Sequence, residues 1–403
     1  MIANLRFQIG LLAGLQALLL VNNSTLIAVN ALAGFLLTDN KVFASLPVTG
    51  YVLGAAVWSM PAAWVMRRYG RRAGYTFGSA AAIVGAGLAG FAMAQQSLAL
   101  LCLATFVSGI YNAFGVSLRF AAADVADAWR PSFRARAISL VLTGGIVGGI
   151  VGPQVSKWSR TVMEQQFEGT YLTLAGFALL SALLVQLLRV PGNAPPKPGD
   201  APPRPLREIL RQPAAWVAIV SAALAYGVMN LLMVATPLAM EVCSHPYNAA
   251  ATVLQWHIVG MFAPGLITGS LIARFGILPI ITTGAVLNAV CVAVALAGVS
   301  IANFTIALFL LGVGWNFMYT GGTTLLTTAY RPQERNKVQG FMDACVFMVM
   351  ITSSAASGAL LFVNGWDILN MLSLPFVALV LGAAVWAASR LGWSLGRVAR
   401  AGT

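Results

Sequence analysis

Two pairs of side chains at four-residue spacing are the residues in this chain best suited to chemistry. Met229 and Met233 form one pair, and His257 and Met261 form the other, on the next apolar segment. Residues at positions i and i+4 lie on the same face of a helix, so each pair presents two side chains together. Thioethers and imidazole are the soft to borderline ligands that select Cu(I) over hard cations. The spacing predicts a copper site, and core packing of methionine is the alternative.

The composition is that of a membrane protein. Of the 403 residues, 59% are hydrophobic and 9% are charged, and the mean hydropathy is +0.82. A soluble domain has about 25% charged residues. The first apolar run is longer than the apolar region of a signal peptide, so we expect it to remain as a span. We predict an all-α membrane protein with twelve transmembrane helices, at residues 8–37, 43–66, 72–94, 97–122, 135–158, 169–190, 214–241, 249–273, 277–299, 302–329, 338–362 and 368–390.

The distribution of positive charge predicts the orientation of these helices. Of 24 Lys and Arg residues, only Lys41, Lys157 and Arg160 fall in loops assigned to the outside, and Arg119 lies in or near a helix. The other 20 lie on the opposite side, which is the bias of cytoplasmic loops. We therefore expect a multi-pass protein of the bacterial inner membrane with both termini in the cytoplasm. The net charge of +13 then reflects contact with the lipid bilayer, and no nucleic-acid partner is expected.

The two halves of the chain repeat each other. The loop that begins at Arg68 recurs at Arg274, 206 residues later, and the loop that begins at Arg130 recurs at Arg331, 201 residues later. A near-constant offset indicates an internal duplication. The Pro-rich stretch between the halves cannot pack as a core and behaves as a linker. We predict an N-terminal six-helix half at residues 1–190, a cytoplasmic linker at 191–213, and a second six-helix half at 214–403 that contains the metal site.

This organisation resembles the major facilitator superfamily, whose members have two six-helix halves. Gly269 to Gly276 is similar to the superfamily's loop motif, with Ala273 where Asp is usual, and the first-half loop has Arg67 at the Asp position. The resemblance implies a secondary transporter that works by alternating access.

The two ligand pairs are also matched in depth. Met233 and His257 each lie seven residues from the outer end of their segments, which places both about 10 Å below the surface. Met229 and Met261 are both eleven residues in.

These four positions resemble the CcoA-like copper importers of the superfamily, which have Met-x-x-x-Met on the seventh helix and His-x-x-x-Met on the eighth. The resemblance implies copper import, with copper as the transported substrate and no resident cofactor. It also implies supply to haem–copper (cbb3-type) oxidase assembly, with a copper chaperone or oxidase assembly factors as partners, and a functional cysteine at Cys243.

Further residues are candidates for steps around this site. Met240, Cys243 and His245 form an outer group that either captures copper before entry or is an incidental helix end. Cys345, between Met342 and Met348 on one segment, either packs in the core or lies on a transit path. Polar and aromatic residues at membrane depth either line a cavity or bond neighbouring helices: Asn22, Asn23, Tyr111, Asn112, Trp315 and Asn316.

Two alternatives to copper import remain. Aromatic Tyr111, Trp315 and Tyr319 and a partial Gly-Pro motif at Gly152-Pro153 favour an organic-solute transporter, either a riboflavin-like importer or a drug exporter. The other alternative is a membrane copper sensor that binds metal without transporting it. The sequence has no nucleotide-binding loop, zinc-protease motif or nucleophile elbow, so an enzyme is not expected.

Overall fold

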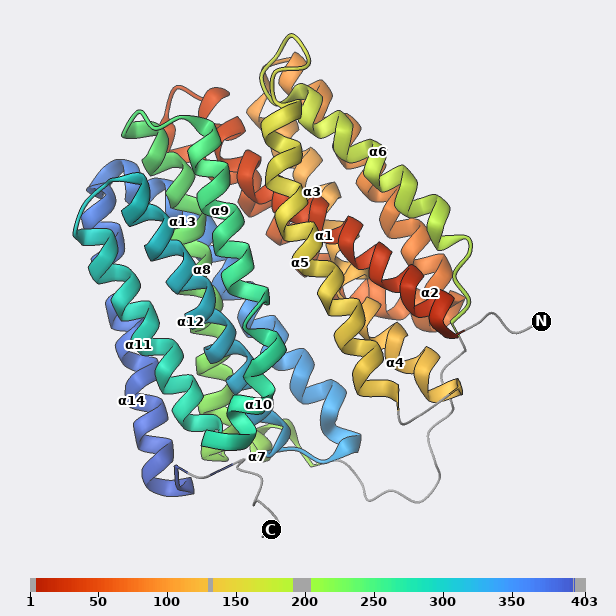
Figure 1. Cartoon of the computed structure of the whole chain (residues 1–403), viewed down its shortest axis with the longest axis vertical. Coiled ribbons are helices and arrows are strands. Elements are labelled where there is room, and N and C mark those ends of the chain that lie inside the picture. The colour runs from red at the N-terminus through yellow and green to blue at the C-terminus, as the bar shows by residue number, and fades with distance from the viewer. Residues whose placement is uncertain (1–4, 130–132, 191–203, 394, 396–403) are drawn as a thin grey trace. The chain divides into compact units, whose positions relative to one another are not determined.

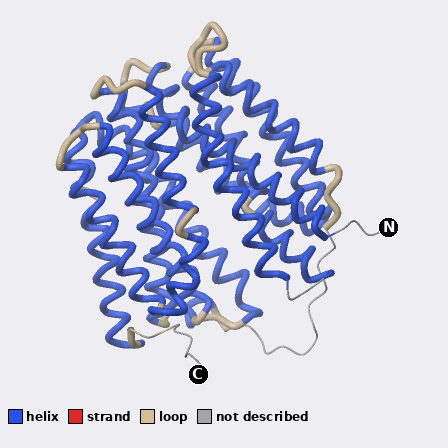
Figure 2. Tube along the Cα trace, viewed as in Figure 1, coloured by secondary structure: helices blue, strands red, loops and turns tan. Residues whose placement is uncertain are grey.

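The computed structural model describes residues 5–129, 133–190, 204–393 and 395, and its regular elements within these ranges are all helical (Figure 1). Figure 2 shows the same described residues as helices joined by short loops. The chain forms two compact units. The first consists of Met1–Pro195 and Pro237–Gln255, and the second of Pro196–Thr236 and Trp256–Thr403. Most of the predicted linker, at residues 191–203, and the first-half loop residues 130–132 lie outside the described residues.

The first unit is built on two helix packings, α1 on α5 and α2 on α3 and α6. Gly148 of α5 allows the first of these, because a Cβ there would lie 2.6 Å from Cβ of Leu20 and 2.8 Å from the Val21 backbone nitrogen. Ser24 and Thr25 of α1 then donate hydrogen bonds of 3.0 Å to the carbonyls of Gly148 and Gly152. The glycine positions of α5 therefore serve close helix packing. The elements are α1 (Leu5–Leu36), η1 (Lys41–Phe43), α2 (Leu46–Ala94), α3 (Leu98–Gly115), α4 (Leu118–Trp129), α5 (Arg134–Ser159) and α6 (Glu168–Val185).

The second unit packs α11 on α12 and α14. Its second predicted span, at 249–273, is a bent pair in which α9 and α10 meet at 41° around Pro264. Proline cannot continue the helical hydrogen bonds, so the bend has a local cause. The end of α8 and the start of α9 belong to the first unit, because residues 237–255 are part of it. The elements from Leu206 onward are α7 (Leu206–Leu210), α8 (Pro213–Val242), α9 (Tyr247–Phe262), α10 (Gly265–Phe275), α11 (Ile277–Leu296), α12 (Ile301–Thr327), η3 (Pro332–Glu334), α13 (Arg335–Met371) and α14 (Leu374–Leu391).

The described residues hold nine helical stretches that are long and apolar enough to span a membrane, and ten with the bent pair. Two of them, Lys41–Ala94 and Lys337–Leu391, have 54 and 55 residues. At 1.5 Å per residue each is about 80 Å long, more than twice the hydrocarbon thickness of a bilayer. Gly70 (φ 87°) and Gly365 (φ 84°) interrupt them with backbone angles that L side chains rarely adopt. Counting each long stretch as two spans gives the predicted twelve, and the predicted fold class is confirmed.

Some boundaries differ from the sequence prediction. The predicted span 97–122 is divided into α3 and α4 at Val116 and Ser117, where the helix is interrupted for two residues. The predicted span 368–390 corresponds to α14, which begins only at Leu374, after Ser373. The assignment of halves to 1–190 and 214–403, with a linker between them, stays a prediction.

Candidate functional site

An aromatic cluster of four side chains lies within the second unit. The Trp315 and Tyr319 rings of α12 are stacked, with centroids 5.3 Å apart and an interplanar angle of 11°. Tyr226 of α8 meets both rings edge-on, at 5.1 and 4.9 Å. Phe262, the last residue of α9, approaches the Trp315 ring at 6.3 Å. Three helices thus contribute rings to one cluster, in which Tyr226, Tyr319 and Phe262 remain partly exposed.

The indole of Trp315 has an unused hydrogen-bond donor. Trp315 is only 5% exposed, and its Nε1 has no hydrogen-bond partner among the described residues. A buried N–H group without a partner costs about 1–3 kcal/mol. Native proteins leave few buried polar groups unpaired, so this one calls for a partner such as a water molecule or a ligand. This N–H is therefore a donor available to a bound molecule.

The adjacent Asn316 has a structural task. Its Nδ2 donates to the carbonyl of Met261 at 2.7 Å, and its Oδ1 accepts a hydrogen bond from Thr268 Oγ1 at 2.7 Å. Met261 precedes the α9–α10 bend and Thr268 follows it. Asn316 therefore holds the two sides of the bend on α12, which places Phe262 beside the aromatic cluster.

His257 is fully buried on α9, and one of its ring nitrogens is unused. Nδ1 lies 2.7 Å from the carbonyl oxygen of Leu308 on α12. A carbonyl only accepts, so Nδ1 bears the hydrogen of this bond and Nε2 is the acceptor of the neutral ring. Nε2 has no partner among the described residues. α9 and α12 thus supply one orphan donor, at Trp315, and one orphan acceptor, at His257.

The three methionines of the predicted metal site are also buried, Met229 and Met233 on α8 and Met261 on α9. α8 is held by Asn230, which lies next to Met229 and donates to the Met350 carbonyl and to Ser353 Oγ of α13 at 3.1 and 3.0 Å. The described residues contain no group of three His, Cys, Asp or Glu side chains placed to hold a metal ion. Whether the thioethers converge with His257 on a copper ion stays a prediction.

The predicted outer group lies where α8 ends, within the first unit. Met240 is fully buried, whereas Cys243 and His245 are half-buried in the loop to α9. The His245 backbone N–H donates to the Met240 carbonyl at 2.9 Å, and Ser244 between them has a φ of 60°. Cys345 on α13 is a half-buried free thiol. The roles of these residues in capture or transit stay predictions.

The first unit contains a polar chain across three helices. Tyr51 of α2 donates to Asn23 Oδ1 of α1 at 2.5 Å, and Asn23 Nδ2 donates to Asn112 Oδ1 of α3 at 2.9 Å. Asn23 and Asn112 are half-buried, and the neighbouring Asn22 is buried with an Oδ1 that has no partner among the described residues. Helix–helix bonding is thus one function of Asn23 and Asn112, while Asn22 retains an unused acceptor.

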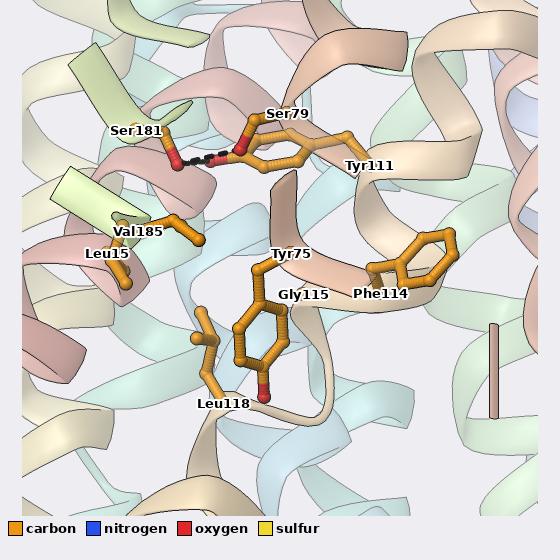
Figure 3. Close-up of a pocket in the computed structure, with 9 residues that line it drawn as sticks. All are labelled: Leu15, Tyr75, Ser79, Tyr111, Phe114, Gly115, Leu118, Ser181 and Val185. Atoms are coloured by element: carbon orange, nitrogen blue, oxygen red, sulfur yellow. Dashed lines mark hydrogen bonds between the residues drawn. The ribbon is translucent and has the colours of Figure 1, made fainter. Parts of the chain in front are cut away.

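Tyr111 lines a very small cavity in the first unit (Figure 3). Its hydroxyl donates to Ser181 Oγ of α6 at 3.0 Å, and Ser79 of α2 shares a hydrogen bond of 3.2 Å with the same Ser181 oxygen. The cavity measures about 10 Å³, which is close to the space that one water molecule needs. It is therefore too small for a transported solute.

Near the kink of α2, an ion pair joins Arg71 to Asp124 of α4, with nitrogen–oxygen distances of 2.8 and 2.5 Å. Arg119, also on α4, lies over the Phe120 ring at 4.9 Å, and its Nε has no partner among the described residues.

Comparison with known proteins identifies the family. The model of the Major Facilitator Superfamily matches residues 12–265. Riboflavin transporter RfnT of Brucella anthropi is 37% identical over 368 residues, which cover 91% of this chain and 92% of the relative. The chain belongs to the major facilitator superfamily. This membership indicates a role in transport rather than catalysis.

Other relatives in the superfamily agree with this assignment. The uncharacterized MFS-type transporter YddS of Bacillus subtilis is 28% identical, covering 89% of this chain and 86% of the relative. The solved D-xylose–proton symporter has a TM-score of 0.74 at 14% identity, covering 98% of this chain and 100% of its own. Nucleoside transporter NupG has a TM-score of 0.73 at 15% identity, covering 96% and 100%. These two structures support the fold alone.

The superfamily prediction is confirmed, but the finer prediction of a CcoA-like copper importer is not supported. The relative at 37% identity, RfnT, is a riboflavin transporter. It favours the organic-solute alternative over copper transport and metal binding. Tyr226 of α8 and Phe262 of α9, which complete the aromatic cluster, were not predicted from the sequence.

Proposed function

We propose that this protein is a secondary transporter of a flat, aromatic nitrogen heterocycle of the riboflavin class. The observation that carries the proposal is the cluster of Tyr226, Trp315, Tyr319 and Phe262 around an indole N–H that has no partner among the described residues. We further propose that it works in the inner membrane of a bacterium, with both termini in the cytoplasm.

The chemistry of the cluster suits such a solute. Aromatic side chains favour offset-stacked or edge-to-face partners, and each pair adds about 0.5–1.5 kcal/mol beyond its buried area. A flavin ring system has carbonyl oxygens that accept from an indole N–H, and one imide N–H that donates to an imidazole nitrogen. Trp315 Nε1 and His257 Nε2 are an unused donor and an unused acceptor of those two kinds. The riboflavin transporter relative, at 37% identity, supports the same substrate class.

Copper import is a second candidate, favoured by one observation. The Nε2 lone pair of His257 is buried and unpaired among the described residues, with its Nδ1–H fixed on a backbone carbonyl. Metal-binding histidines use this arrangement. In this reading Met229, Met233 and Met261 complete the ligand set, copper is the substrate, and a copper chaperone or oxidase assembly factor receives it.

Uptake by whole cells tests the two candidates side by side. The protein is expressed in a riboflavin-auxotrophic bacterium without a riboflavin transporter, and uptake of radiolabelled riboflavin and of copper-64 is measured in parallel. We expect riboflavin uptake above the empty-vector control, and growth at low external riboflavin. Accumulation of copper alone would replace this proposal with the copper candidate, and uptake of neither would reject both.

A further inference from the structure

A groove on the first unit is separate from the residues considered for transport. It lies between α2, just after the Gly70 kink, and the end of α6, and its volume is about 520 Å³. Arg72, Thr76 and Gln186 provide its polar wall, and Phe77 and Ala80 provide an apolar wall further along α2. The groove therefore has a polar end and an apolar end, both on helices that form candidate spans.

The polar end of the groove is positively charged, because the hydrogen-bond partner of Arg72 there is a neutral side chain. Arg72 donates to the amide oxygen of Gln186 at 3.1 and 3.4 Å, and an amide is neutral. Arg71 differs, because its charge is matched by Asp124. Gln186 is oriented by a second bond, from its Nε2 to Thr76 Oγ1 at 3.0 Å. Arg67 and Arg68, on the other side of the kink, are exposed.

The surroundings indicate the depth of the groove in the membrane. Trp64 and Tyr69 lie edge to face, with centroids 6.0 Å apart, and both are more than half exposed. Exposed tryptophan and tyrosine rings are typical of the boundary between hydrocarbon and headgroups. Phe77 of the apolar wall is exposed two turns further into the span. The arginines then lie at headgroup level, and the apolar wall lies at the level of acyl chains.

We propose that this groove binds the headgroup of an anionic phospholipid. The phosphate contacts Arg72 at the N–H groups that Gln186 leaves unused, those of Nη1 and the second one of Nη2, which present two parallel donors to phosphate oxygens. Arg67 and Arg68 add attraction for the negative lipid charge. An acyl chain lies along Phe77 and Ala80. A zwitterionic lipid gains less from this group of cations, so the site selects for net negative charge.

The test is a lipid titration of the purified full-length protein in detergent, followed by native mass spectrometry. We expect phosphatidylglycerol to bind at least fivefold more tightly than phosphatidylcholine. Arg72→Gln should weaken phosphatidylglycerol binding about five- to tenfold, the loss expected for a charge-assisted hydrogen bond at an exposed site. Arg274→Gln is the matched control, because Arg274 is an exposed arginine in the last turn of α10, in the second unit. It should bind phosphatidylglycerol like the wild type.

A second variant tests the apolar end without altering the arginines. Ala80 is exposed, so Ala80→Trp fills the groove without entering the core and should weaken phosphatidylglycerol binding. Three results would overturn the proposal. They are unchanged binding by both Arg72→Gln and Ala80→Trp, equal affinity for the two lipids, and displacement of phosphatidylglycerol by equimolar inorganic phosphate, which would identify a site for small anions instead.

Discussion

Replacing Trp315 with phenylalanine isolates the contribution of one N–H group. The substitution retains an aromatic ring beside Tyr226 and Tyr319, whose centroids lie 5.1 and 5.3 Å from that of Trp315. It removes Nε1–H, which is buried without a partner among the described residues. In the protein without solute, removing that group recovers about 1–3 kcal/mol and offsets part of the packing lost with the smaller ring. We therefore expect a melting temperature close to that of the wild type.

The same change should weaken solute binding. A neutral hydrogen bond contributes about 0.5–1.5 kcal/mol, which corresponds to a two- to tenfold rise in the KM for riboflavin uptake. Initial rates of uptake over a range of riboflavin concentrations measure this shift. The matched control is Trp216→Phe, because Trp216 is an exposed tryptophan on α8 that packs edge-on against Trp386. An unchanged KM in Trp315→Phe, with a normal melting temperature, would refute the assignment of this N–H to the solute.

Three further predictions address other parts of the structure. His257→Phe should remove the acceptor for the imide N–H of riboflavin. Riboflavin and N3-methylriboflavin should then compete equally for uptake by the variant, whereas the wild type should prefer riboflavin. A preference for riboflavin retained in the variant would contradict this role of His257. Hydrogen bonds from Arg204 lower the pKa of Glu334, the last residue of η3, below its ordinary value of 4.5. Since a lowered folded pKa stabilises the fold above the unfolded value, this stabilisation should be complete above about pH 4.5 and decline at lower pH. Thermal unfolding of Glu334→Gln should show a lower melting temperature at pH 7 and a weaker pH dependence between pH 5 and 3, and a wild-type profile would exclude the contribution. Gly148→Ala should destabilise by about 1–3 kcal/mol through overpacking against α1, while Gly87→Ala, whose added Cβ meets nothing within 4 Å, should be tolerated; equal melting temperatures would contradict the packing argument.

The overall architecture was predictable because it depends on properties that a sequence displays directly. Runs of apolar residues indicate bilayer-spanning helices. The duplication indicated by the offset between Arg68 and Arg274 stays a prediction. Local interruptions were harder to place. The break between α3 and α4 contains no proline, whereas the bend between α9 and α10 does contain Pro264, inside the predicted span 249–273.

The candidate site was only partly predictable, because it depends on which face of each helix meets its neighbours. Trp315 was named from its residue type, but its neighbour Tyr226 was not. Asn316 was a candidate for lining a cavity, yet both ends of its amide bond the α9–α10 bend. The spacing of His257 and Met261 describes one helix and says nothing of where α8 directs Met229 and Met233. The sequence pattern alone therefore gave more weight to a metal than the named relative supports.

Transport by the purified protein is the most direct test of the central claim. The wild-type protein is reconstituted into liposomes preloaded with unlabelled riboflavin, and entry of labelled riboflavin by counterflow is measured against protein-free liposomes. We predict saturable accumulation that lumiflavin inhibits, because lumiflavin has the same aromatic ring system. Absence of riboflavin counterflow, in a preparation that accumulates copper-64, would contradict the account and make the copper candidate the function of this chain.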